Sequence, residues 1–184
     1  MRILISNDDG INAKGLKVLC DGLRTEHQIT VVAPTVERSA CGHGLTLRKE
    51  MKLLELAENV YSLDGLPADC VSMGLLYLLK KSPPDLVISG INGGGNLGQD
   101  IYYSGTVAAA REAHILGVPS MAISQFVRSA LTDDWPRATA WAAAVIAAVY
   151  RPDVPPPAVA DPAVHRETLE TLSRVVNHGH RPCC

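Results

Sequence analysis

Aromatic residues are scarce in this chain, and long apolar runs are absent from it. Phe, Trp and Tyr make up only 4% of the 184 residues, whereas hydrophobic residues in total make up 47%. An aliphatic core is therefore expected, and the chain is long enough for one domain with a substantial core. No apolar run reaches the ~20 residues of a membrane-spanning helix, so we expect no partner in the membrane.

A net positive charge and paired cysteine motifs are also missing. The formal net charge is −2, so the chain offers no basic field for a nucleic-acid duplex. The five cysteines show no Cys-x-x-Cys spacing, and their odd number argues against a disulfide framework. The chain begins directly with a strand pattern, so we expect no signal peptide. We therefore expect reduced thiols in a cytoplasmic protein.

What the sequence does contain is a pair of adjacent carboxylates between a strand and a helix. The apolar residues 2–6 predict a buried strand, and leucines at helical spacing predict a helix over residues 13–24. Asp8 and Asp9 lie between them, at the carboxyl edge where open α/β sheets bind ligands. Two neighbouring acids repel each other, and a cation between them removes the repulsion. The alternative is an ordinary turn, because Asn, Asp and Gly are turn residues.

Strand and helix patterns alternate along the first 150 residues. A second strand over residues 28–33 completes a strand–helix–strand unit, which implies parallel pairing. Further on, strand patterns cover residues 45–48, 51–56, 60–63, 85–89 and 118–124, and helix patterns cover 66–80 and 108–116. Asp133 and Asp134 precede a long alanine-rich helix that ends near Tyr150, and we expect them to cap it rather than bind metal. The alternation predicts an α/β fold with a mostly parallel sheet.

The composition changes after about residue 150. Residues 152–162 contain five prolines, which is typical of a linker, and residues 163–176 predict a short amphipathic helix. We therefore divide the chain into an α/β domain over residues 1–150 and a divergent proline-rich linker and tail over residues 151–184.

Two more polar segments follow predicted strands at the same edge of the sheet. Residues 35–44 contain Ser39 and His43, which either reach the aspartates or belong to a surface loop. Residues 90–98 contain five glycines, which allow close backbone approach to a ligand. Asn92 and Asn96 add amide oxygens to this segment, whose spacing matches neither a dinucleotide fingerprint nor a P-loop.

Small residues open the helix that follows the glycine-rich segment. Ser104-Gly105-Thr106 is either a plain N-cap or a phosphate cradle, and its place behind a glycine-rich loop favours phosphate. All the candidate ligands at this edge carry oxygen donors, which suit Mg²⁺ or Mn²⁺ better than zinc. A divalent metal beside an anion cradle indicates phosphate ester chemistry.

These residues resemble the SurE family, the survival protein E 5′-nucleotidases. The matching stretches lie in family order over roughly residues 1–125, and their combination is specific although single pieces are not. They are Ser6-Asn7-Asp8-Asp9-Gly10, Val32-Ala33-Pro34, Arg38-Ser39, Leu45-Thr46-Leu47, Asp64-Gly65, Pro67-Ala68-Asp69-Cys70-Val71, Ser89-Gly90-Ile91-Asn92, Asn96-Leu97-Gly98 and Tyr103-Ser104-Gly105-Thr106-Val107-Ala108-Ala109-Ala110.

The resemblance implies a metal-dependent phosphatase that hydrolyses nucleoside 5′-monophosphates, with one Mg²⁺ or Mn²⁺ per subunit. It also implies a Rossmann-like three-layer αβα sandwich that assembles as a homodimer or tetramer through a C-terminal hairpin arm. By the same match, the metal ligands would be Asp8, Asp9, Ser39 and Asn92. The phosphate would be bound by Asn96, Ser104, Gly105 and Thr106.

The sequence leaves several points open. The attacking group is either a metal-oriented water or a carboxylate of Asp8 or Asp9, and we favour water because a metal-bound carboxylate is a poorer nucleophile. His43 is a candidate proton donor to the leaving ribose oxygen. The family's usual sequence is missing after about residue 150, so we expect the arm to be lost or altered. The alternative function is a non-catalytic nucleotide- and metal-binding module.

Overall fold

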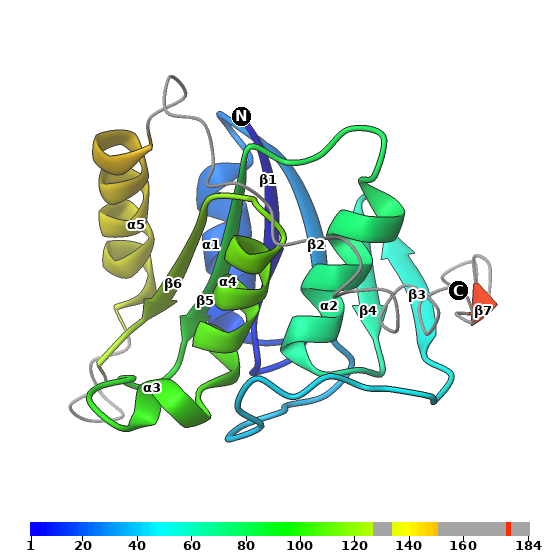
Figure 1. Ribbon diagram of the computed structural model, residues 1–184. Coiled ribbons are helices and arrows are strands. Elements are labelled where there is room, and N and C mark those ends of the chain that lie inside the picture. The colour runs from blue at the N-terminus through cyan, green and yellow to red at the C-terminus, as the bar shows by residue number, and fades with distance from the viewer. Residues whose placement is uncertain (127–133, 151–175, 178–184) are drawn as a thin grey trace.

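The structure is a computed structural model that describes residues 1–126, 134–150 and 176–177 (Figure 1). Its strands form one sheet in the order β6-β5-β1-β2-β4-β3-β7, and only the β3–β4 pair is antiparallel. The strands are β1 (Arg2–Ser6), β2 (Gln28–Pro34), β3 (Lys52–Ala57), β4 (Val60–Leu63), β5 (Leu86–Asn92), β6 (Ser120–Ser124) and β7 (Val176–Asn177). The predicted proline-rich linker and most of the predicted tail helix lie outside the described residues.

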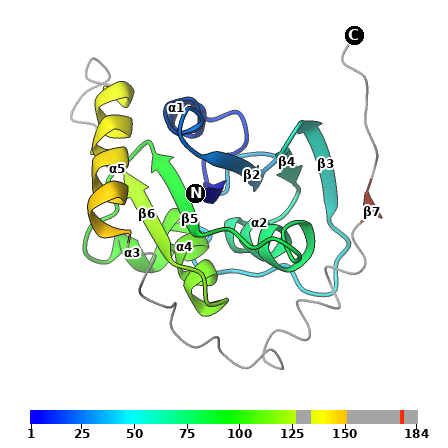
Figure 2. The ribbon, with the colours of Figure 1, turned by 90° about the horizontal axis from the view of Figure 1, so that it is seen from above.

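Helices cover both faces of this sheet. The helical segments are α1 (Lys14–Leu23), α2 (Pro67–Met73), the π-helical turn η1 (Gly74–Leu78), α3 (Asp100–Tyr103), α4 (Gly105–Ile115) and α5 (Trp135–Val149). Helices α1 and α5 lie on one face, and α2 and α4 lie on the other (Figure 2). This arrangement confirms the predicted three-layer fold. None of the helices in the part of the chain that the structure describes is long and apolar enough to cross a bilayer.

Side-chain alternation along the central strand β1 builds two apolar layers. Ile3 and Ile5 pack in the layer beneath α1 and α5, whereas Leu4 packs in the layer beneath α2 and α4. Successive side chains of a strand point to opposite faces, so a strand that is covered on both sides needs an unbroken apolar run. This requirement explains why residues 2–6 predict a strand so clearly.

The structure departs from the sequence-based expectation at three places. Residues 45–48 form no strand; Arg48 has φ +57°, a left-handed conformation that an extended strand does not accommodate. The fifth strand continues to Asn92, because the pairing of β5 with β6 resumes beyond Gly90. The helix expected over residues 66–80 is α-helical only to Met73. At Gly74 a Cβ would lie 2.7 Å from a methyl of Leu4, so the following turn packs closely against β1.

The strand order places a switch point next to β1. The connection through α1 leads from β1 to β2 on one side, and the connection through α2 returns the chain to β5 on the other side. Where the connections that follow two adjacent parallel strands run to opposite sides of the sheet, the carboxyl ends of those strands are the usual ligand-binding place in open α/β sheets. Asp8 and Asp9 follow β1 at this switch point.

Candidate active site

The turn after β1 presents two carboxylates at the switch point. The side-chain amide of Asn7 donates to the Gly10 carbonyl at 2.9 Å, and Gly10 has φ +94°. A Cβ at Gly10 would lie 3.1 Å from the backbone of Val36, so the turn packs tightly against the loop after β2. The ordinary turn that the sequence analysis gave as the alternative to a cation site is therefore present. It also places Asp8 and Asp9 at the carboxyl end of β1, at the switch point.

Asp8 is held from the start of α4. It is 5% exposed, and the hydroxyl of Thr106 donates to its Oδ1 at 2.5 Å. A Cβ at Gly105 would lie 2.7 Å from Cβ of Asp8 and 2.9 Å from Sγ of Cys41, so only glycine fits there. Thr106 is completely buried, and the observed role of its side chain is to orient Asp8. The sequence predicted an N-cap or a phosphate contact for this segment and did not predict the contact with Asp8.

Asp9 connects the ends of β1 and β5. Its Oδ2 accepts a hydrogen bond from the Gly93 N–H at 3.3 Å. Burial raises the pKa of Asp9, and the nearby charges of Asp8 and Glu37 raise it further, against the lowering effect of the Gly93 hydrogen bond. Asp9 is thus a partly buried carboxylate beside two other acids, and a bound cation would offset their repulsion.

The other predicted site residues lie at the same edge, Ser39 and Asn96 on loops and Asn92 at the end of β5. The Ser39 hydroxyl donates to Glu37 Oε1 at 2.6 Å, and the Asn92 amide nitrogen donates to the Gly94 carbonyl at 2.7 Å. The amide nitrogen of Asn96 donates to the Ser124 hydroxyl at 2.7 Å. Since the donors are engaged, the hydroxyl and amide oxygens of Ser39 and Asn92 are the atoms that can bind a cation.

No hydrogen bond among the described residues joins Ser39, Asn92 or Asn96 directly to either aspartate. The backbone nevertheless brings Ser39 close, because the N–H of the preceding residue Arg38 donates to the Asp8 carbonyl at 2.7 Å.

The donor set at this edge fits a hard divalent cation. It comprises two carboxylates, a hydroxyl and an amide oxygen. Within the described ranges, no three His, Cys, Asp or Glu side chains gather as a metal-binding group. A cation here would therefore depend on neutral oxygen ligands beside Asp8 and Asp9, which suits Mg²⁺ or Mn²⁺ and not zinc.

The start of α4 combines a cap with backbone donors. The Ser104 hydroxyl accepts from the Val107 N–H at 3.1 Å, which confirms Ser104 as the N-cap. The N–H groups of Gly105 and Thr106 precede the first intrahelical hydrogen bond, so the helix itself offers them no acceptor. Backbone donors at a helix N-terminus attract anions, and these two lie next to Asp8.

His43 contacts Glu112, a residue that the sequence analysis did not single out. Its Nε2 lies 2.8 Å from Oε2 of Glu112, an α4 residue that is 1% exposed. The available signal was an acid within a helix otherwise rich in alanine, where a buried charge requires a partner. The proposed transfer of a proton from His43 to a leaving group is not tested by this geometry.

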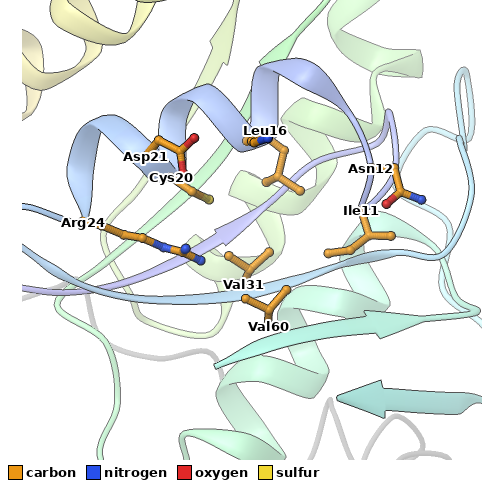
Figure 3. A pocket seen from close by; sticks show the side chains of 9 residues that line it. Ile11, Asn12, Leu16, Cys20, Asp21, Arg24, Val31 and Val60 are labelled. Atoms are coloured by element: carbon orange, nitrogen blue, oxygen red, sulfur yellow. The ribbon is translucent and has the colours of Figure 1, made fainter. Parts of the chain in front are cut away.

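A separate hollow lies away from these residues. A cavity of about 270 Å³ opens between α1 and the strands β2 and β4, with Leu16, Val31 and Val60 among its lining residues (Figure 3). The Arg24 side chain extends from the end of α1 toward Val31 (Figure 3). None of the predicted site residues lines this cavity.

Helices on both faces of a mostly parallel sheet, with an oxygen-rich site at the switch point, define a Rossmann-like α/β protein. Comparison with known sequences identifies the group within this class. The model of the survival protein SurE family matches residues 3–177, and the chain belongs to that family. This match extends beyond the stretches over residues 1–125 on which the resemblance was based.

Relatives with known names agree with this assignment. The chain is 43% identical over 176 residues to the 5′-nucleotidase SurE of Geobacter metallireducens, covering 96% of this chain and 69% of that protein. It is 50% identical over 147 residues to the 5′-nucleotidase SurE of Paramagnetospirillum magneticum, covering 79% and 56%. The crystal structure of the SurE protein from Aquifex aeolicus matches with a TM-score of 0.77 at 39% identity, over 82% of this chain and 60% of that one. The chain thus spans only part of the length of these relatives.

Proposed function

We propose that this chain carries the catalytic domain of a metal-dependent 5′-nucleotidase, which hydrolyses nucleoside 5′-monophosphates to nucleoside and phosphate. The observation that carries the proposal is the hydrogen bond between Thr106 and Asp8, which joins the first carboxylate of the pair to a helix N-terminus at the switch point. The names of the relatives point to the same reaction.

One Mg²⁺ or Mn²⁺ ion fits this proposal. Asp8, Asp9, Ser39 and Asn92 would hold it, and it would supply neutralising charge and an oriented water when bound. Thr106 keeps Asp8 in the orientation that such a ligand needs, because its hydroxyl donates to one carboxylate oxygen and leaves the other for the cation. The excess negative charge around Asp9 supports a cation at this position.

The phosphate lies, in this proposal, at the start of α4. The N–H groups of Gly105 and Thr106, together with the positive end of the helix dipole, stabilise the charge on the phosphoryl oxygens during attack by water. The Ser104 hydroxyl keeps the first turn in place by capping it, and Asn96 adds a side-chain amide from the glycine-rich loop. An aspartyl nucleophile in place of water remains the alternative mechanism.

Phosphate release from nucleoside monophosphates tests the activity directly. We expect release with Mg²⁺ or Mn²⁺, none with excess chelator, and recovery when metal is added back. Full activity in excess chelator would contradict the metal dependence. Metal-dependent nucleotide binding without phosphate release would instead identify the alternative, a non-catalytic binding module.

We also propose that the chain works as a homodimer or tetramer in the cytoplasm. Large apolar side chains are strongly exposed, among them Leu97 (70%), Tyr102 (73%) and Phe126 (70%), and a second subunit would shield such surface. Free thiols at Cys20 and Cys70 support a reducing compartment. Light scattering after size-exclusion chromatography gives the mass in solution, and a strictly monomeric protein would contradict the assembly.

A further inference from the structure

The loop that contains Ser39 has no regular secondary structure to hold it. Residues 35–51 connect β2 to β3 without a helix or a strand. A loop without a backbone ladder takes its position from individual hydrogen bonds. The contacts of this loop therefore decide where the Ser39 oxygen lies relative to Asp8 and Asp9.

Hydrogen bonds hold the loop at both ends. Near its start, the Arg38 N–H donates to the Asp8 carbonyl at 2.7 Å, and the Gly42 N–H donates to the Tyr103 carbonyl at 2.9 Å. Near its end, the backbone N–H and the hydroxyl of Thr46 donate to the carboxylate of Asp69 at 2.9 and 2.7 Å. The loop is thus held against the site at one end and against α2 at the other.

A buried carboxylate holds the middle of the loop. Glu112 Oε2 lies 2.8 Å from His43 Nε2, and Glu112 Oε1 accepts from the Ser72 hydroxyl at 2.7 Å. The side chains of His43 and Glu112 are 20% and 2% exposed, so water screens their interaction only weakly. A buried carboxylate is stabilised by its hydrogen bonds, and moving His43 away would take one of them from Glu112, which costs free energy.

We propose that His43 and Glu112 are positioning residues, which lock the Ser39 loop onto α4 and thereby set the affinity of the site for its divalent cation. The helix that carries Glu112 also carries Thr106, the residue that orients Asp8. Helix α4 therefore positions the Asp8 carboxylate through Thr106. Through Glu112 and His43 it also positions the loop that carries the Ser39 hydroxyl. This inference rests on the proposed metal-dependent function. Loss of a residue that orients a metal ligand typically lowers metal affinity about 10–100-fold.

The test compares three variants of the full chain. His43→Ala removes the tether, His43→Gln restores an N–H donor of similar reach, and His114→Ala changes an exposed histidine on the same helix as Glu112. Two measurements need no turnover. Titration with Mn²⁺, followed by electron paramagnetic resonance, gives the Kd for the metal. Hydrogen exchange of the metal-free protein gives the exchange rates of the Arg38 and Gly42 backbone amides, which hold the loop.

We expect His43→Ala to raise the Kd for Mn²⁺ about 10-fold and to speed exchange at both amides. His43→Gln should recover most of both losses, and His114→Ala should change neither. Glu112→Gln keeps the side-chain volume and removes the charge, so it should shift both measurements in the same direction. It supplies the test if His43→Ala does not fold.

Two results would overturn the positioning role. Unchanged exchange and unchanged Kd in His43→Ala, together with a lower kcat, would make His43 a proton donor and not a tether. Faster exchange with an unchanged Kd would show that the loop position does not control the metal. A wild-type chain that binds Mn²⁺ but releases no phosphate would refute the nucleotidase activity alone, because the Kd shift between variants would still decide the positioning role.

Discussion

Two Asp-Asp pairs occur in this chain, one before α1 and one before α5, and the structure uses them differently. At the second pair, Asp134 caps α5, and its hydrogen bonds within the described residues go to its own helix. Its Oδ1 accepts from the Arg137 N–H at 3.1 Å, and its Oδ2 accepts from Arg137 Nε at 2.6 Å. These hydrogen bonds with Arg137 lower the pKa of Asp134. The predicted capping role is therefore confirmed for Asp134; Asp133 lies outside the described residues.

The first pair is held by distant parts of the chain. Thr106, which holds Asp8, is 98 residues away, and Gly93, which holds Asp9, is 84 residues away. The N-cap of α1 is Ala13, so neither aspartate caps that helix. The pKa of Asp9 is raised by burial, opposite to the shift at Asp134. A carboxylate satisfied by its own helix is structural, whereas one buried with uncompensated charge is available for a ligand.

The largest effect is expected when the two pairs are changed in parallel. Asp9→Asn removes a proposed metal ligand, so metal binding and phosphate release should both fall to background. Asp134→Asn keeps an N-cap residue at α5 and should retain nearly full activity. Phosphate release and Mn²⁺ titration on both variants give the comparison. Equal losses in the two variants would show that the pairs do not differ in function.

A second pair of variants compares buried threonines in the two regions. Thr106→Val removes the hydroxyl that orients Asp8 and should lower turnover roughly 10²-fold, as is typical for groups that orient a metal ligand. Thr139→Val in α5 removes a buried hydroxyl that has no hydrogen-bond partner among the described residues. That variant should keep its activity and be as stable as the wild type or more stable. Steady-state kinetics and thermal unfolding separate the two, and a fully active Thr106→Val would contradict its role.

The opposite pKa shifts predict opposite effects on stability without metal. The ordinary pKa is 3.8 for both side chains. Because the pKa of Asp9 is raised in the folded state, its ionisation destabilises the fold progressively as the pH rises above 3.8. Because the pKa of Asp134 is lowered, its contribution is present above 3.8 and is lost as the pH falls below that value.

In excess chelator at neutral pH, Asp9→Asn should therefore raise the Tm, and Asp134→Asn should lower it slightly. The Asp9→Asn difference should shrink as the pH falls toward 3.8, whereas the Asp134→Asn difference should persist down to about 3.8 and shrink only below that pH. Thermal unfolding across this range measures them. A lower Tm for metal-free Asp9→Asn would mean that the charge of Asp9 is compensated by the protein itself.

The smallest effect on the folded chain is expected at an exposed side chain of α5. Trp141 is 71% exposed and borders a groove of about 790 Å³ between α5 and β6. Trp141→Ser should change the free energy of unfolding by only about 0.5 kcal/mol or less, because the ring is mostly in water already. Self-association should weaken if Trp141 packs against a second copy. Sedimentation at several concentrations detects that change, and a large loss of stability would show that Trp141 belongs to the core.

Local patterns account for much of the fold. The apolar run of β1, the helical spacing in α1 and the Asp134 cap were all predicted, because each depends on neighbours within a few residues. The predictions failed where a distant packing partner decided the local backbone. The loop at residues 45–48 is held by Asp69, and the end of β5 is set by its pairing with β6.

The sequence by itself determined which chemistry is available: two carboxylates after the first strand, and oxygen ligands after later ones, at the edge where parallel strands end together. Only the tertiary structure decided which residues support that chemistry. Thr106 reaches Asp8 across 98 residues, and Glu112 reaches His43 across 69 residues. The physical reason is that hydrogen-bond partners of this kind depend on the order of strands in the sheet and on which face each helix covers, and no local periodicity encodes either.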